Sequence, residues 1–337
     1  MTRATGFGLA RGAAFAGAAV AFPFVFTPAW IVNIGVLTLM YAALATAWNL
    51  FSGYTGYITL GQAAFFGLGA YTLGITFEHV GIGSGYNPFY ALPLVGAGVA
   101  LASLPVAWIA LRTRQMTFAI VTLTLLFIVQ QLAFNLHSLT KGSTGLMLPT
   151  PRFPIDSYDR PFYLAMLAIL LVALGLCWLI MRSKLGLTLL AIREDEEKAR
   201  GLGIRVTSAK LVAWSLMVWL SAMVGGVWAY YLTFIYPESS VDPLVMIGAV
   251  LMTFLGGRGT LWGPAVGALV LVPAQQYMIT RLGASEFYLV GYSAVFMVVL
   301  LLLPRGILPS LRDALDSWRE RRRTHGSKPV VHGEVRT

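Results

Sequence analysis

Long apolar runs, separated by shorter polar segments, recur along almost the whole chain. An α-helix needs about 20 mostly apolar residues to cross roughly 30 Å of hydrocarbon. The pattern predicts an all-α fold, a polytopic transmembrane helical bundle of about ten spans. The runs long enough, or nearly long enough, to span are residues 8–27, 31–51, 58–77, 90–111, 116–136, 162–182, 209–235, 243–256, 262–281 and 287–303.

Two of these runs leave alternatives open. Run 8–27 contains Arg11 and is interrupted near its end by Pro23 and Pro28, so it is either a signal peptide or a retained helix. We expect a retained helix, because no clear small-residue cleavage site follows it. Run 243–256 is short for a full crossing, so it is either a half-helix or a helix that continues through the glycines after it.

The basic residues fall unevenly between the two sets of connecting segments. Lysine and arginine concentrate in the cytoplasmic loops of membrane proteins. We therefore expect the N-terminus and the C-terminus to be cytoplasmic, since alternating spans then place 20 of the 24 basic residues inside. The inside segments in this arrangement are residues 1–12, 52–57, 112–115, 182–210, 257–261 and 304–337.

Composition narrows the class of protein. Of the 337 residues 57% are hydrophobic and only 11% are charged, whereas a soluble domain has about 25% charged residues. In a membrane protein the net charge of +10 indicates basic cytoplasmic loops rather than nucleic-acid binding. The single cysteine, Cys177, excludes a disulfide and a thiol metal cluster, and the four histidines lie too far apart for a metal motif. We expect one transmembrane domain over residues 1–317 and a basic, disordered tail over 318–337 that rests on anionic lipid.

One charged segment stands between two apolar runs. Residues 183–210, called the island below, read SKLGLTLLAIREDEEKARGLGIRVTSAK. Its core predicts a short helix, because Glu194 and Lys198, and Glu196 and Arg200, are four residues apart with the acid first. Two glycines that follow favour a helix end. The island is either a solvated loop that happens to be helical or a docking helix for a cytoplasmic partner.

Two glycine-rich stretches resemble one another. Gly53 and Gly56 precede one span, and Gly256 and Gly259 precede another with the same spacing. Each stretch enters its span from the cytoplasmic side in the topology given above. Transporters often use repeats with interrupted helices near the substrate path, but small residues also serve plain helix packing in lipid. Both interpretations stay open.

The sequence shows no group that could drive transport by itself. No Asp, Glu, Lys or Arg lies in the middle of a span, although a deep ionisable group is typical of proton-coupled transporters. There is no GxxxxGK(S/T) phosphate-binding loop and no catalytic motif. The amides within the spans are poor acids, bases and nucleophiles, so an enzyme is not expected.

Three stretches together resemble a known family. NLFSGYTGYITLGQAAFFGLGAY (49–71), LTLLAIREDEEKARGLGIRVTSAKL (187–211) and FLGGRGTLWGPAVGA (254–268) are similar to the permease subunit of bacterial branched-chain amino-acid ABC importers. The resemblance implies a multi-pass inner-membrane subunit that works with a second, related permease, two cytoplasmic ATPases and an extracytoplasmic binding protein. The island would then be the ATPase-coupling segment, through Ala191, Arg193, Glu194, Asp195, Glu197, Arg200, Gly201 and Gly203.

The expected function is ATP-driven import of branched-chain or other neutral amino acids, with no cofactor and no metal. Import of urea or short amides by the same mechanism is the alternative, followed by an ion-coupled secondary transporter. An amino-acid zwitterion must be met here by amides, helix ends and backbone at the glycine-rich breaks. The expected translocation-path residues are therefore Asn49, Gly53, Gly56, Gln62, Gly67, Gly256, Gly259 and Gly263.

Overall fold

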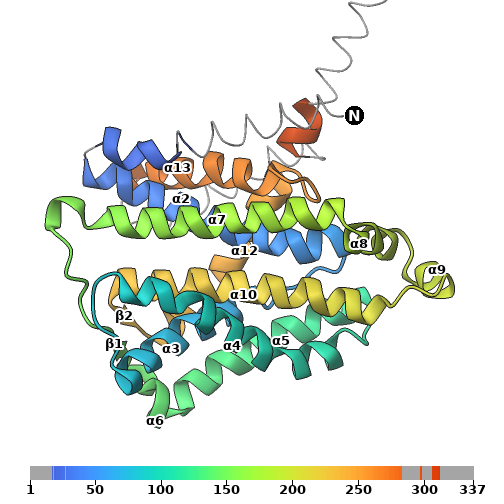
Figure 1. Cartoon of the computed structure of the whole chain (residues 1–337), viewed down its shortest axis with the longest axis horizontal. Coiled ribbons are helices and arrows are strands. Elements are labelled where there is room, and N and C mark those ends of the chain that lie inside the picture. The colour runs from blue at the N-terminus through green and yellow to red at the C-terminus, as the bar shows by residue number, and fades with distance from the viewer. Residues whose placement is uncertain (1–16, 18, 27, 283–296, 298–305, 312–337) are drawn as a thin grey trace, which may run out of the picture.

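The structure, a computed structural model, describes residues 17, 19–26, 28–282, 297 and 306–311. Nearly all regular structure in this part of the chain is helical, as the apolar runs predict, and two short antiparallel strands pair Leu146 with Ile235. The protein is an all-α polytopic bundle (Figure 1). Its elements are α2 (Ala29–Trp48), α3 (Gln62–Val80), α4 (Asn87–Ala110), α5 (Gln115–Asn135), α6 (His137–Thr140), β1 (Leu146–Met147), α7 (Asp159–Arg182), α8 (Lys184–Glu194), α9 (Glu196–Gly201), α10 (Val206–Leu232), β2 (Phe234–Ile235), α11 (Pro237–Ser240), α12 (Pro243–Gly256) and α13 (Gly263–Leu282).

Within the part of the chain that the structure describes, six helical segments are long and apolar enough to cross a membrane. The expected number of about ten spans stays a prediction, because run 287–303 lies outside the described residues apart from Met297, and only residues 17 and 19–26 of the first run are described. The six segments are Ala29–Gly53, Asn87–Ala110, Gln115–Asn135, Asp159–Arg182, Val206–Leu232 and Pro237–Gly256.

The bundle has two distinct ends. Helices α8 and α9 lie at one, called the island end, and β1, β2 and α6 lie at the other, called the strand end (Figure 1). The segments that the charge pattern groups together meet at the island end: Lys210 Nζ is 3.4 Å from the carbonyl oxygen of Leu111, and a Cβ on Gly257 would be 2.6 Å from Pro309. Which side of the membrane this end faces stays a prediction.

Helices α3 and α10 cross at backbone contact. A Cβ on Gly225 would lie 1.9 Å from the carbonyl oxygen of Phe66, and one on Gly69 would lie 2.1 Å from that of Ala222. Only glycine permits such an approach, as is common where helices pack in lipid. This crossing fixes the position of α3 in the centre of the bundle.

Helix α3 begins inside the bundle and not at its island end. Gln62, its first residue, donates from Nε2 to the Leu44 carbonyl at 2.9 Å and to Ser221 Oγ at 3.0 Å. Ser221 lies about 22 Å along α10 from Val206, at 1.5 Å per residue. The chain therefore turns at Gly56 and runs back into the bundle as extended backbone before α3 starts.

The segment that leads into α12 also lies inside the bundle. The carbonyl oxygen of Val241, just before α12, accepts a hydrogen bond from Gln130 of α5 at 3.1 Å, and Val241 also packs where a Cβ of Gly67 would lie. Helix α12 then ends at Gly256, and Gly257 has a φ of +119°. Helix α12 therefore does not continue through the glycines after it. With α11 on its N-terminal side it forms Pro237–Gly256, which is long enough to cross a membrane, and whether it crosses fully stays a prediction.

Candidate functional site

The island forms two helices where the sequence predicts one. Asp195 separates α8 from α9 with extended backbone, at φ −160° and ψ 106°. Its carboxylate caps α9, since Oδ1 accepts from the Lys198 amide at 3.0 Å and Oδ2 pairs with the Lys198 ammonium at 3.0 Å. Lys198 therefore pairs with Asp195 and not with Glu194. The expected pair of Glu196 and Arg200 is confirmed at 2.8 Å.

Helix α8 packs on the bundle through a face that the sequence did not indicate. Leu189 and Ile192 are buried, together with Gly186, whose Cβ would meet the carbonyl oxygen of Ile180 at 2.3 Å. Leu187, also on α8, is 69% exposed. The helix is therefore seated firmly against the end of α7.

The outer surface of the island is charged and has an apolar tip. Leu202, at the turn after α9, is 82% exposed. A single exposed leucine is common on protein surfaces, so Leu202 does not by itself mark a protein contact. The other exposed residues of this surface are Glu194, Glu197, Lys198, Arg200, Gly201, Gly203 and Arg205.

Arg193 points in the opposite direction, into the bundle. Its Nη1 donates to the carbonyl oxygen of Gly53 at 3.1 Å. The same nitrogen lies 2.7 Å from where a Cβ of Gly259 would be, and its Cγ lies 3.1 Å from where a Cβ of Gly56 would be. One island side chain thus contacts both glycine-rich stretches.

The two stretches also bind each other directly. Asn49 donates from Nδ2 to the Thr260 carbonyl at 2.9 Å, and its Oδ1 accepts from the Gly259 amide at 2.7 Å. Gly56 and Gly259 have φ values of +78° and +80°, which is unfavourable for residues with a Cβ. The similarity in spacing therefore corresponds to two turns that lie side by side.

A buried ion pair joins α9 to α10 beside these turns. The side chain of Lys210 is 1% exposed, and its ammonium lies 3.0 Å from Oε1 of Glu196. Tyr57, one residue after the turn at Gly56, donates its hydroxyl to Glu196 Oε2, and its ring centroid is 4.1 Å from the Lys210 ammonium. Helix α9 is thereby connected both to α10 and to the extended segment that leads into α3.

The Glu196 carboxyl is ionised at neutral pH. Burial opposes its ionisation, but the Tyr57 hydrogen bond and the Lys210 ammonium outweigh burial and hold the pKa below the ordinary value of 4.5. The carboxylate therefore stabilises the fold fully above about pH 4.5, and this contribution is lost as the pH falls through the lower folded-state pKa.

The predicted path residues occupy more than one place. Asn49, Gly53, Gly56 and Gly259 surround Arg193, as described above. Gly256 and Gly263 hold the turn between α12 and α13, because a Cβ on Gly256 would lie 1.7 Å from the Gly263 carbonyl oxygen. Gln62 and Gly67 lie deeper, at the start of α3, and Gln62 Oε1 is buried without a hydrogen-bond partner.

Sequence reasoning missed four residues of this region, namely Tyr57, Glu196 as a buried acid, Leu202 and Lys210. Lys210 offered one signal, because it is a charged residue within the apolar run 209–235. Within the described residues, no three His, Cys, Asp or Glu side chains gather closely enough to hold a metal ion.

Comparison with known proteins gives a consistent picture. Residues 30–304 match the family model described as "Branched-chain amino acid transport system / permease component". The chain is 28% identical over 324 residues to the "High-affinity branched-chain amino acid transport system permease protein LivM" of Salmonella typhimurium and of Escherichia coli, covering 88% of this chain and 74% of each relative. A shorter similarity, 30% over 115 residues, links 33% of the chain to 32% of the "Autoinducer 2 import system permease protein LsrC" of Yersinia pestis. No solved structure matches the chain.

Proposed function

The chain belongs to the family of branched-chain amino acid permease components, and we propose that it is a translocation subunit of an ATP-driven importer for branched-chain or other neutral amino acids. Family membership makes it a transport subunit and not an enzyme. The two LivM permeases, which match over most of this chain, are named for branched-chain amino acids, and this favours such substrates over urea or short amides.

The observation that carries this proposal is the position of Arg193 between the island and the two glycine turns. A partner that pushes on the exposed island surface moves α8, and Arg193 hydrogen-bonds from α8 to Gly53. The turns at Gly56 and Gly259 precede α3 and α13, so movement there reaches the interrupted helices. Rigid elements joined in this way transmit motion between distant sites.

The proposed assembly contains a second related permease, two cytoplasmic ATPases and an extracytoplasmic binding protein. The island end then faces the cytoplasm of a bacterial cell, together with both termini. Among the candidate spans α5 is the least buried, and it exposes the polar side chains of Thr124, Gln131 and Asn135. Polar residues are costly against lipid, which supports coverage of this face by the second permease.

Transport by the reconstituted complex tests the proposal directly. Proteoliposomes that contain both permeases, the ATPases and binding protein should accumulate leucine, isoleucine or valine only when ATP is present on the ATPase side. Collapse of the proton and sodium gradients should change uptake little, because no Asp, Glu, Lys or Arg lies in the middle of a described span. Gradient-driven uptake without ATPases would overturn the proposal in favour of a secondary transporter, and competition by urea or an amide but not by leucine would correct the substrate.

Charge reversal on the island tests docking. The double substitution Glu194→Lys and Glu197→Lys alters two exposed acids of the outer surface while leaving Arg193 and Glu196 in place. Exposed ion pairs contribute only about 0.2–1 kcal/mol each, so we expect the pair of reversals to reduce ATPase co-purification severalfold.

The matched control for docking is Glu238→Lys, which reverses an exposed acid at the strand end. The control should retain its ATPases. Unchanged co-purification and unchanged substrate-stimulated hydrolysis in the double variant would place the ATPase contact elsewhere.

A further inference from the structure

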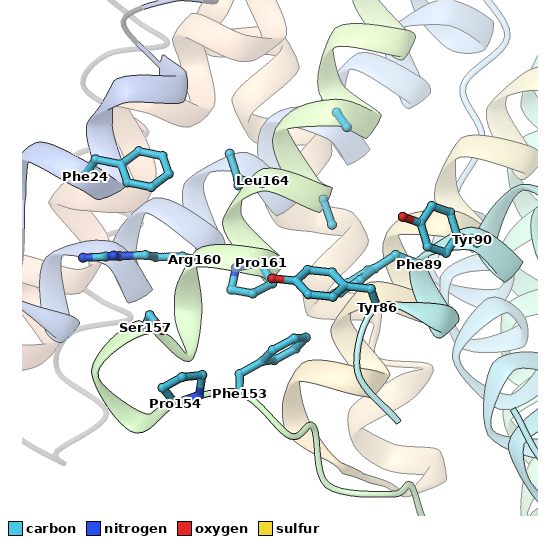
Figure 2. A pocket seen from close by; sticks show the side chains of 12 residues that line it. Phe24, Tyr86, Phe89, Tyr90, Phe153, Pro154, Ser157, Arg160, Pro161 and Leu164 are labelled. Atoms are coloured by element: carbon cyan, nitrogen blue, oxygen red, sulfur yellow. The ribbon is translucent and has the colours of Figure 1, made fainter. Parts of the chain in front are cut away.

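A pocket of about 600 Å³ lies at the strand end, far from the island. It opens between the first turns of α4 and the segment that leads into α7 (Figure 2). Its walls are mostly aromatic and aliphatic, and none of the described residues that line it is acidic. The lining comprises Phe24, Tyr86, Phe89, Tyr90, Phe153, Pro154, Ser157, Arg160, Pro161, Leu164, Ala165 and Ala168.

The pocket has a polar end and an apolar end. Ser157 lies in the short turn just before α7 and Arg160 in the first turn of α7, where the apolar part of the helix begins. Leu164, Ala165 and Ala168 continue the lining along α7 toward the middle of the bundle. The distance from Arg160 to Ala168 is about 12 Å along the helix axis. This arrangement matches a molecule with a polar head and an extended hydrocarbon tail.

Arg160 has no ion-pair partner among the side chains that the structure describes. Its guanidinium carbon lies 5.5 Å from the ring centroid of Phe24. The adjacent Asp159 accepts a hydrogen bond from the Tyr231 hydroxyl at 2.7 Å. An anionic group at the polar end would therefore meet an unpaired cation, and arginine is well suited to phosphate.

The pocket opens toward the surroundings of the bundle. Tyr90 is 78% exposed, Tyr86 is 59% exposed and Phe24 is 56% exposed. In a membrane protein such tyrosines are typical of the interface between headgroups and hydrocarbon. A free amino acid fits less well, because its ammonium group would find no acidic partner among the described lining residues.

We propose that this pocket binds one phospholipid, with the phosphate at Arg160 and an acyl chain along Leu164, Ala165 and Ala168. The lipid fills the gap between α4 and α7 and holds the two helices together at the strand end. Phe153 forms the inner wall, with its ring centroid 5.1 Å from that of Tyr86.

Lipid retention measured by native mass spectrometry tests the site. The purified complex, loaded with dioleoyl phosphatidylglycerol or with phosphatidylethanolamine, should retain one fewer lipid per permease when Arg160 is replaced by glutamine. The apparent affinity for that lipid should fall about tenfold or more. The control is Arg152→Gln, an exposed arginine at the same end that does not line the pocket.

A second variant leaves the headgroup contact intact. Ala165→Phe fills the apolar end of the pocket and should displace the same lipid while Arg160 remains. Inorganic phosphate should not compete, because the acyl chain supplies much of the binding. Unchanged lipid retention in both variants would overturn the proposal, as would displacement of the lipid by leucine or by inorganic phosphate alone.

Discussion

Replacing Glu196 with glutamine is expected to destabilise the permease by about 3–5 kcal/mol, because the substitution leaves the Lys210 ammonium buried without a counter-charge. The Lys210 side chain is 1% exposed, and Glu196 is the only carboxylate that pairs with it among the described residues. The lysine cannot turn to solvent without breaking its contact with the Tyr57 ring. The lost stability therefore reflects an uncompensated charge and not the net strength of the ion pair.

The single cysteine of the chain allows this loss of stability to be measured directly. Cys177 is buried in α7, so a thiol-reactive fluorophore added to purified protein reports unfolding during heating. Glu196→Gln should melt at a clearly lower temperature, whereas the exposed neighbour substitution Glu197→Gln should not. The double substitution Glu196→Gln with Lys210→Met removes the buried charge and should recover most of the loss. Equal melting of wild type and Glu196→Gln would show that Lys210 is neutralised in another way.

The sequence predicts this ion pair poorly for a physical reason. Apolar runs mark the spans because every spanning segment meets the same hydrocarbon, so a local pattern suffices. Glu196 and Lys210 are paired through the relative position of α9 and α10, which no local pattern encodes. For the same reason the sequence places Glu194 opposite Lys198 on one continuous helix, while the structure breaks the helix at Asp195 and uses that carboxylate as a cap.

The glycine turns show what the spacing of residues alone can and cannot predict. The matching spacing of Gly53 and Gly56 with Gly256 and Gly259 indicates a repeat, and the structure places the two turns side by side. Spacing cannot show that Arg193 lies between them. The sequence therefore assigns Arg193 to coupling and the glycines to the translocation path, although one hydrogen bond joins the two groups. The interior start of α3 at Gln62 was likewise hidden within the apolar run 58–77.

Replacing Arg193 with glutamine is expected to separate ATP hydrolysis from transport. The side chain faces the turns and not the exposed island surface, so docking of the ATPases should persist. Loss of a hydrogen bond from a charged group changes a conformational equilibrium by about 1.5–3 kcal/mol, which corresponds to a factor of about 10–100. Substrate uptake by the reconstituted importer should therefore fall by about that factor, while ATPase co-purification and hydrolysis remain near wild-type values.

The matched control is Arg205→Gln, which removes an exposed island arginine that forms no contact with the glycine turns. It should leave the ratio of uptake to hydrolysis unchanged. Gly259→Ala provides an independent route to the same effect, because its Cβ would lie 2.7 Å from Arg193 Nη1 and because φ is +80°. If Arg193→Gln lowered uptake and ATPase co-purification together, Arg193 would be a docking residue. If the ratio stayed at its wild-type value in both variants, motion would pass to the spans by the other connection, through Glu196, Lys210 and Tyr57.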